Sequence, residues 1–129
     1  MYKVLTLVGT RPEIIKLSLT IKKLDKLFDH ILVHTGQNYD YELNKIFFKD
    51  LNIRKPNYFL NSKSKNAINT ISKIFNKFDD LCEKLKPNAV LILGDTNSSL
   101  AAIVASKKKY QFFILKQVID VLIKILLKN

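Results

Sequence analysis

The sequence predicts an α/β fold in which an open parallel sheet carries helices on both of its faces. Three observations support this prediction. Short apolar runs typical of strands alternate with segments whose apolar residues recur every three or four positions. One of these runs, residues 89–93, is apolar without alternation, as expected for a central parallel strand. Finally, each of the three glycines follows a predicted strand directly.

The first strand is predicted over residues 3–8, and it stops at Gly9. Pro12 follows where the first turn of a helix tolerates proline. The apolar face of that helix has steps of three and four residues and consists of Ile14, Leu17, Ile21, Leu24 and Phe28. Residues 30–35 then predict a second short strand, which ends at Gly36.

Residues 41–51 predict a second helix, whose inward-facing side chains are Leu43, Ile46, Phe47 and Leu51. Pro56 ends that region, and residues 58–60 predict a short strand. The longest amphipathic helix is predicted from the spacing of Ile68, Ile71, Phe75, Phe78, Cys82 and Leu85. After the strand at 89–93, Asp95 and Thr96 offer capping side chains for a helix over residues 100–105.

Three loops contain the glycines and follow predicted strands: residues 9–13, 35–38 and 94–98. Because the carboxyl ends of parallel strands share one edge, we expect these loops to meet where open α/β sheets bind ligands. Glycine allows close backbone approach, and helix N-termini offer amide donors to a phosphate. The glycines are Gly9, Gly36 and Gly94, and the polar side chains are Arg11, Glu13, Lys16, Gln37, Asn38, Asp95 and Thr96. Turn formation and helix capping alone explain any single loop, but the convergence of three favours a binding site.

Several other classes of protein are disfavoured. The chain has 129 residues, is 47% hydrophobic and carries one cysteine, which suits a single domain without disulfides. It lacks G-x-G-x-x-G and Walker A motifs, so no dinucleotide cofactor is expected. His30 and His34 lack a third ligand, so no metal is expected either.

The net charge of +11 comes from lysines dispersed over helix surfaces, so we expect no nucleic-acid partner. Without a basic and apolar leader, the protein is expected in the cytoplasm.

Four motifs carry a resemblance to a known family. They are VGTRPEIIKLS, HTGQNYDYELN, KPNYFLN and KPNAVLILGDTNSSLAA, in this order. Together they resemble the N-terminal part of the non-hydrolysing UDP-N-acetylglucosamine 2-epimerases, over residues 1 to about 109. The HTGQNYDYELN motif is similar to the branch that forms UDP-N-acetyl-L-fucosamine for surface polysaccharides.

The resemblance implies a fold, a reaction and a set of site residues. The family has two Rossmann-like domains in the GT-B arrangement, and this chain would supply the first half. Its members are isomerases that invert C2 of the sugar by eliminating UDP and adding it back, and intact members resemble homodimers. Carried over by motif, Arg11 and Lys16 would face the UDP-sugar in the cleft, Gln37 and Asn38 would lie in a substrate-side loop, and Asp95 would be catalytic.

Residues 110–129 depart from the family pattern, which continues with IPIFHIEAG and then NRCFD. Permitted codons for YQFFILKQVIDVLI, read one base earlier, translate as IPIFHIEAGNRCFD. Lysine codons at 107–109 would give an adenine run, a natural site for losing one base. We therefore expect an out-of-frame tail at 110–129 after a domain at 1–109, with the second domain absent and the chain inactive alone.

The tail and the isolated domain leave alternatives open. The tail is apolar but is interrupted by Lys116, Asp120 and Lys124, so it is not expected to span a membrane, which needs about 20 mainly apolar residues. A peripheral amphipathic helix is one alternative, and a short strand or helix docked on the sheet is favoured over it. The alternative to a truncated enzyme is a domain that binds a nucleotide sugar and works with a separately encoded second half.

Overall fold

The computed structural model describes residues 2–92 and 111–114. Its centre is a sheet with the strand order β3-β2-β1-β4-β5, and every pair of neighbouring strands is parallel. In chain order the strands are β1 (Lys3–Val8), β2 (Asp29–His34), β3 (Tyr58–Phe59), β4 (Ala89–Ile92) and β5 (Gln111–Ile114). The predicted open parallel sheet is confirmed, and part of the predicted tail is a strand paired with β4.

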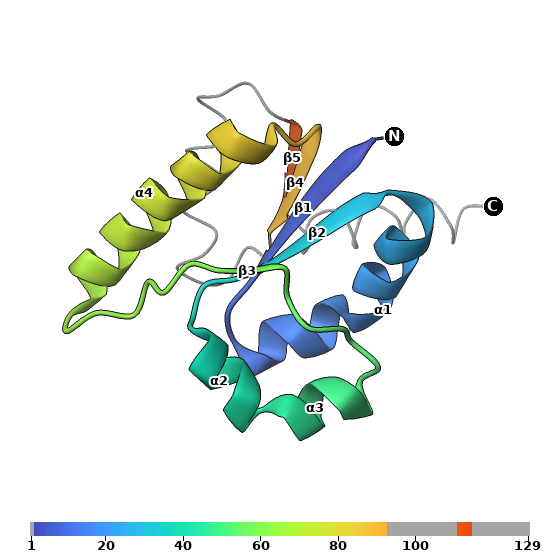
Figure 1. The fold of residues 1–129 in the computed structure, drawn as a ribbon, viewed down its shortest axis with the longest axis horizontal. Coiled ribbons are helices and arrows are strands. Elements are labelled where there is room, and N and C mark those ends of the chain that lie inside the picture. The colour runs from blue at the N-terminus through green and yellow to red at the C-terminus, as the bar shows by residue number, and fades with distance from the viewer. Residues whose placement is uncertain (1, 93–110, 115–129) are drawn as a thin grey trace.

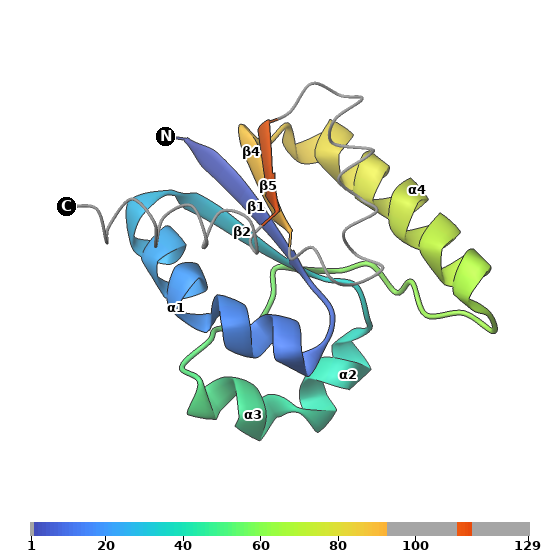
Figure 2. The same ribbon diagram turned by 180° about the vertical axis from the view of Figure 1, so that it is seen from behind.

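Two helical layers cover the sheet (Figures 1 and 2). The helix α4 (Ala67–Leu85) covers one face, and α1 (Arg11–Leu27), α2 (Asn38–Leu43) and α3 (Lys45–Asp50) cover the other. Alternate residues of a strand point to opposite faces. Accordingly, Leu5 and Val33 pack under α4 with Phe78, whereas Leu32 packs on the other face with Leu17.

Local capping explains where the long helices begin. Thr10 is the N-cap of α1, and its hydroxyl oxygen accepts a hydrogen bond from the backbone N–H of Glu13. The Asn66 side chain caps α4 in the same way, by accepting from the N–H of Asn69 at 2.8 Å. Such caps satisfy amides that lack a partner within the helix. The buried residues Ile14, Leu17 and Ile21 confirm the predicted apolar face of α1.

The single helix predicted over residues 41–51 is wrong, because the segment forms α2 and α3. Asn44 separates them with φ −112° and ψ 19°, which interrupts the helical phase. Leu43 and Ile46 are consequently 67% and 77% exposed instead of facing inward. The side chains buried from these helices are Tyr41 and Phe48, whose rings pack edge to face at a centroid distance of 5.0 Å.

The predicted face of α4 is correct only in its second half. Phe78 and Cys82 are fully buried, whereas Ile68 is 78% exposed, because the first turns of α4 extend past the end of the sheet (Figure 1). The predicted helix over 100–105 lies outside the described residues. Among residues 2–92 and 111–114, no helix combines the length and the apolar character that a membrane crossing requires.

Candidate functional site

A pocket of about 400 Å³ lies at the carboxyl ends of β1 and β2. The loop after β1 contributes Gly9, Thr10 and Glu13, and the loop after β2 contributes Thr35, Gly36 and Asp40. The remaining wall comes from the segment after β3 and from α4, through Ser62, Lys63, Thr70 and Ile74. The pocket therefore occupies the edge of the sheet that the glycine loops predicted.

Glu13 places a fully buried carboxyl group beside this pocket. Its Oε1 accepts hydrogen bonds from the backbone N–H and from the hydroxyl of Thr10, both at 2.9 Å. Together with the bond from the Glu13 N–H to Thr10, these contacts form a capping box. A Cβ atom on Gly9 would lie 2.4 Å from Thr35 Oγ1, so the two loops approach each other closely at this glycine.

Hydrogen bonds also hold the loop after β2. The N–H of Gly36 donates to His34 Nδ1 at 2.8 Å, and the N–H of Gln37 donates to Asp40 Oδ2 at 2.7 Å. The Ser62 hydroxyl donates to the carbonyl of Thr35 at 2.6 Å, which ties this loop to the segment after β3. Backbone groups of residues 35–37 are therefore fixed from three sides.

Burial lowers the pKa of His34, and the nearby carboxylate of Asp40 opposes this shift. The opposing charge lies at the edge of the pocket, since Asp40 lines it. The lowered pKa makes the imidazole neutral near pH 7, which agrees with its role as acceptor for the Gly36 N–H.

The structure separates the residues that the sequence grouped at this edge. Gly9 and Gly36 line the pocket. Arg11 instead turns toward α3: its Nε donates to Asn44 Oδ1 at 3.1 Å, and its guanidinium lies 5.3 Å from the centroid of the Phe47 ring. Lys16 is exposed on α1 and is not among the described residues that line the pocket.

Gln37 and Asn38 are exposed at the start of α2. The predicted catalytic Asp95 and the third loop glycine, Gly94, lie outside the described residues. Thr10 and Thr35 lie in the predicted loops 9–13 and 35–38 but were given no role, and the prediction did not include Asp40, Ser62 or Lys63. The T-x-x-E spacing of Thr10 and Glu13 was a readable signal, because it is the signature of a capping box at the start of a helix.

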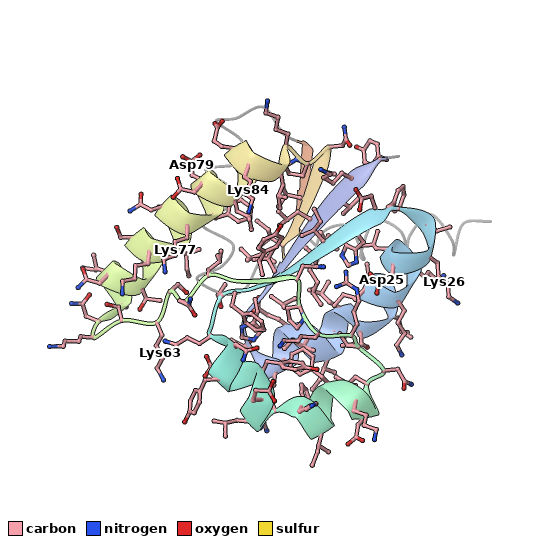
Figure 3. The ribbon with its side chains drawn as sticks, in the orientation of Figure 1. Asp25, Lys26, Lys63, Lys77, Asp79 and Lys84 are labelled. Atoms are coloured by element: carbon pink, nitrogen blue, oxygen red, sulfur yellow. The ribbon has the colours of Figure 1, made fainter. Side chains whose placement is uncertain are left out.

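The opposite edge of the sheet holds a second polar cluster around His30. The His30 Nδ1 lies 2.6 Å from Asp25 Oδ1, and its Nε2 lies 2.7 Å from Thr6 Oγ1. Arg54 donates to Asp25 and to the His30 carbonyl. Figure 3 shows Asp25 on α1, far from Lys63. Within the described residues, no group of three or more His, Cys, Asp or Glu side chains is arranged to hold a metal ion.

A sequence model described as UDP-N-acetylglucosamine 2-epimerase matches residues 22–113. The chain belongs to this epimerase family. A curated UDP-N-acetylglucosamine 2-epimerase from Methanococcus maripaludis is 42% identical over 110 residues, covering 84% of this chain and 29% of the relative.

Solved structures of epimerases agree with this membership. The UDP-N-acetylglucosamine 2-epimerase from Rickettsia bellii is 54% identical with a TM-score of 0.83, covering 88% of this chain and 30% of that one. A Methanocaldococcus jannaschii UDP-GlcNAc 2-epimerase was solved in complex with UDP-GlcNAc and UDP. It is 41% identical with a TM-score of 0.76, covering 85% of this chain and 31% of that one. This chain therefore spans about 30% of the length of the epimerases that it resembles.

Proposed function

We propose that this chain supplies the N-terminal Rossmann-like part, about 30% of the length, of a UDP-N-acetylhexosamine 2-epimerase with a GT-B arrangement. Such an isomerase inverts C2 of the sugar by eliminating UDP and adding it back to the other face. The observation that carries the proposal is the pocket at the carboxyl ends of β1 and β2 in a chain of this family. Open α/β sheets bind nucleotide ligands at this position.

The reaction sets clear demands on the side chains at this edge. Removing the C2 proton needs a base, and the departing diphosphate needs cations or amide donors. We assign proton transfer to Asp95 and contacts with the substrate to Arg11, Lys16, Gln37 and Asn38. Arg11 must exchange its hydrogen bond with Asn44 for the diphosphate, and Lys63 already offers a cation at the pocket.

Binding of UDP-N-acetylglucosamine to the purified chain tests the location of the site. We expect the amide NMR signals of Gly9 and Gly36 to shift on titration, and Lys63→Ala to weaken binding. Lys65→Ala is the matched control, because Lys65 is exposed two residues away and is not among the pocket residues. Shifts confined to other parts of the chain, or equal effects of the two variants, would contradict the assignment.

We further propose that the 129-residue chain alone does not turn over the substrate, because the reaction takes place in a cleft between two domains. A coupled assay for epimerisation with purified chain should stay at the blank rate. Turnover above the blank would overturn this proposal. If a separately encoded second half restores turnover on mixing, the chain is the nucleotide-sugar-binding partner of a split enzyme.

For residues 110–129 we propose an origin by frameshift. The family match runs four residues into this segment and ends at residue 113, and the end of the match so soon after the lysines at 107–109 supports a break in the reading frame near them. The nucleotide sequence of the locus decides the question. Codons that cannot encode IPIFHIEAG in the neighbouring frame would contradict the proposal.

The same resemblance suggests a biological setting. We propose that the complete enzyme is a cytoplasmic homodimer that supplies a UDP-sugar for surface polysaccharide biosynthesis. Analysis of the surface sugars of a strain lacking the intact gene tests this setting, and unchanged surface polysaccharide would argue against it.

A further inference from the structure

His34 is the last residue of β2, and it is followed directly by Thr35 and Gly36, which line the pocket. Its side chain packs between Phe48 of α3 and Phe59 of β3, with ring-centroid distances of 6.4 and 5.8 Å. Its Nδ1 accepts the hydrogen bond from the Gly36 N–H at 2.8 Å. Because a backbone N–H can only donate, Nδ1 must be unprotonated, and the neutral ring carries its proton on Nε2.

The turn over residues 35–37 is built tightly against this ring. A Cβ atom on Gly36 would lie 2.9 Å from His34 Cε1 and 2.6 Å from Asp40 Oδ2. The turn therefore fits between an imidazole that holds the Gly36 amide and a carboxylate that holds the Gln37 amide. Thr35 and Gly36 of this turn line the pocket.

We propose that His34 is a positioning residue: its neutral imidazole keeps the 35–37 turn in the shape that lines the pocket, and protonation of Nδ1 releases the turn. Protonation replaces the acceptor by a second donor facing the Gly36 N–H, so this hydrogen bond cannot persist. The effect of the turn on substrate binding rests on the proposed function, because the turn can affect binding of the UDP-sugar only if the pocket receives that sugar.

The surroundings of His34 favour the neutral ring. The helix α3 and the strand β3 present aromatic rings, and the charged group acting from α2 is Asp40. Glu13 of α1 also lines the pocket, but its carboxylate accepts from Thr10. Burial lowers the pKa of His34, and Asp40 opposes that shift. Release of the turn is therefore expected on acidification below about pH 6.5.

An NMR titration of the ¹⁵N-labelled chain without ligand tests the coupling directly. At pH 7.5 the imidazole shifts of His34 should show the proton on Nε2. On acidification, the Gly36 amide signal should move with the same midpoint as His34. His30 is an internal control, and its titration should leave Gly36 unmoved. A flat Gly36 signal during titration of His34, or a proton on Nδ1 at pH 7.5, would overturn the proposal.

Two variants separate positioning from packing. His34→Asn retains an acceptor near the Nδ1 position without an ionisable ring, so binding of UDP-N-acetylglucosamine should persist and lose its dependence on pH between 7.5 and 5.5. His34→Phe retains aromatic packing without an acceptor and should weaken binding about tenfold, as expected for one lost hydrogen bond. Equal affinity of His34→Phe and the parent chain would contradict the proposal.

The two proposals fail in distinguishable ways. Coupled titration of His34 and Gly36 in a chain that binds no UDP-sugar would leave the positioning of the turn intact and refute the proposed function. Binding of the UDP-sugar with an uncoupled Gly36 would refute the positioning role alone. The titration also decides the matter if a variant fails to fold, because it uses the unmodified chain.

Discussion

The two histidines of β2 are both buried, but their hydrogen bonds serve different purposes. His30, near the amino end of the strand, uses both ring nitrogens, one with Asp25 of α1 and the other with Thr6 of β1. His34, at the carboxyl end, holds a loop amide beside a pocket. The first histidine ties together elements of the fold, and the second supports a surface that faces the pocket.

This difference reflects the geometry of a parallel sheet. At the amino edge, Arg54 and Asn57 complete the cluster around His30: Arg54 contacts Asp25, and Asn57 accepts from the Leu32 N–H. The polar groups there are paired with one another. A hollow also lies at the amino edge, but its lining side chains Asp25, His30, Arg54 and Asn57 are hydrogen-bonded to one another. At the carboxyl edge, the loops after β1 and β2 diverge and leave a hollow lined by the glycine loops. Polar groups at the two edges are therefore expected to respond differently to substitution.

The largest effect is expected at the amino edge. Asp25→Ala removes the acceptor from the buried His30 ring and from Arg54, and it should lower the free energy of unfolding by about 2 to 3 kcal/mol. Urea denaturation measures the loss, and Asp25→Asn is the control, because its amide oxygen can still accept. Affinity of the folded variant for UDP-N-acetylglucosamine should be unchanged. Equal stability of the alanine variant and the parent would show that the cluster does not stabilise the fold.

A smaller loss of stability is expected at the carboxyl edge. Gly36→Ala forces a methyl group against the His34 ring and the Asp40 carboxylate, and it should cost about 1 to 2 kcal/mol and weaken binding in the pocket. Gly9→Ala is the matched control, because its new methyl group meets the Thr35 hydroxyl, a side-chain atom that can rotate away. A larger loss for Gly9→Ala in thermal unfolding would contradict this ranking.

Acidification should destabilise the fold through both histidines. Burial is the main cause that lowers each pKa, with Asp25 opposing it at His30 and Asp40 at His34. At pH values between the lowered pKa values of the folded chain and about 6.5, the unfolded chain therefore binds more protons than the folded chain does. The contribution of the histidines to stability is complete above this pH range and falls as the pH drops through it. Each unit of pKa difference corresponds to about 1.4 kcal/mol.

Urea denaturation at a series of pH values measures this dependence. His34→Asn should remove the part of the pH dependence of stability that His34 contributes and leave the part that His30 contributes. An identical pH dependence in the variant and the parent would assign the whole effect to the amino edge.

The smallest effect on stability is expected for Arg11→Lys, at less than about 1 kcal/mol, because Arg11 is exposed. Its effect on binding should be larger if the guanidinium leaves Phe47 and Asn44 to hold a diphosphate in two parallel hydrogen bonds. Calorimetry with UDP measures the change in binding affinity. Asn44→Ala is the control, since it frees Arg11 and should not weaken binding. If Asn44→Ala weakened UDP binding more than Arg11→Lys, Arg11 would contribute to binding from its present position against Asn44 and Phe47.

Local patterns were sufficient for most of the order of elements and for much of the core. The strand at 3–8, the helix with Pro12 in its first turn and the apolar strand at 89–93 were all predicted. The structure describes the last of these as far as Ile92. These signals depend on residues that are close in the chain. The two loop glycines of the pocket were readable for the same reason, since each follows a strand whose direction the parallel topology dictates.

Tertiary structure decided the rest through contacts between distant residues. The break at Asn44 exposes Leu43 and Ile46, and Arg11 turns toward Asn44, 33 positions along the chain. Ser62 joins the pocket because β3, only two residues long, docks beside β2. Periodicity reports which side of an element is apolar, whereas the partner that covers this side, and the direction of a long polar side chain, depend on elements brought together only by folding.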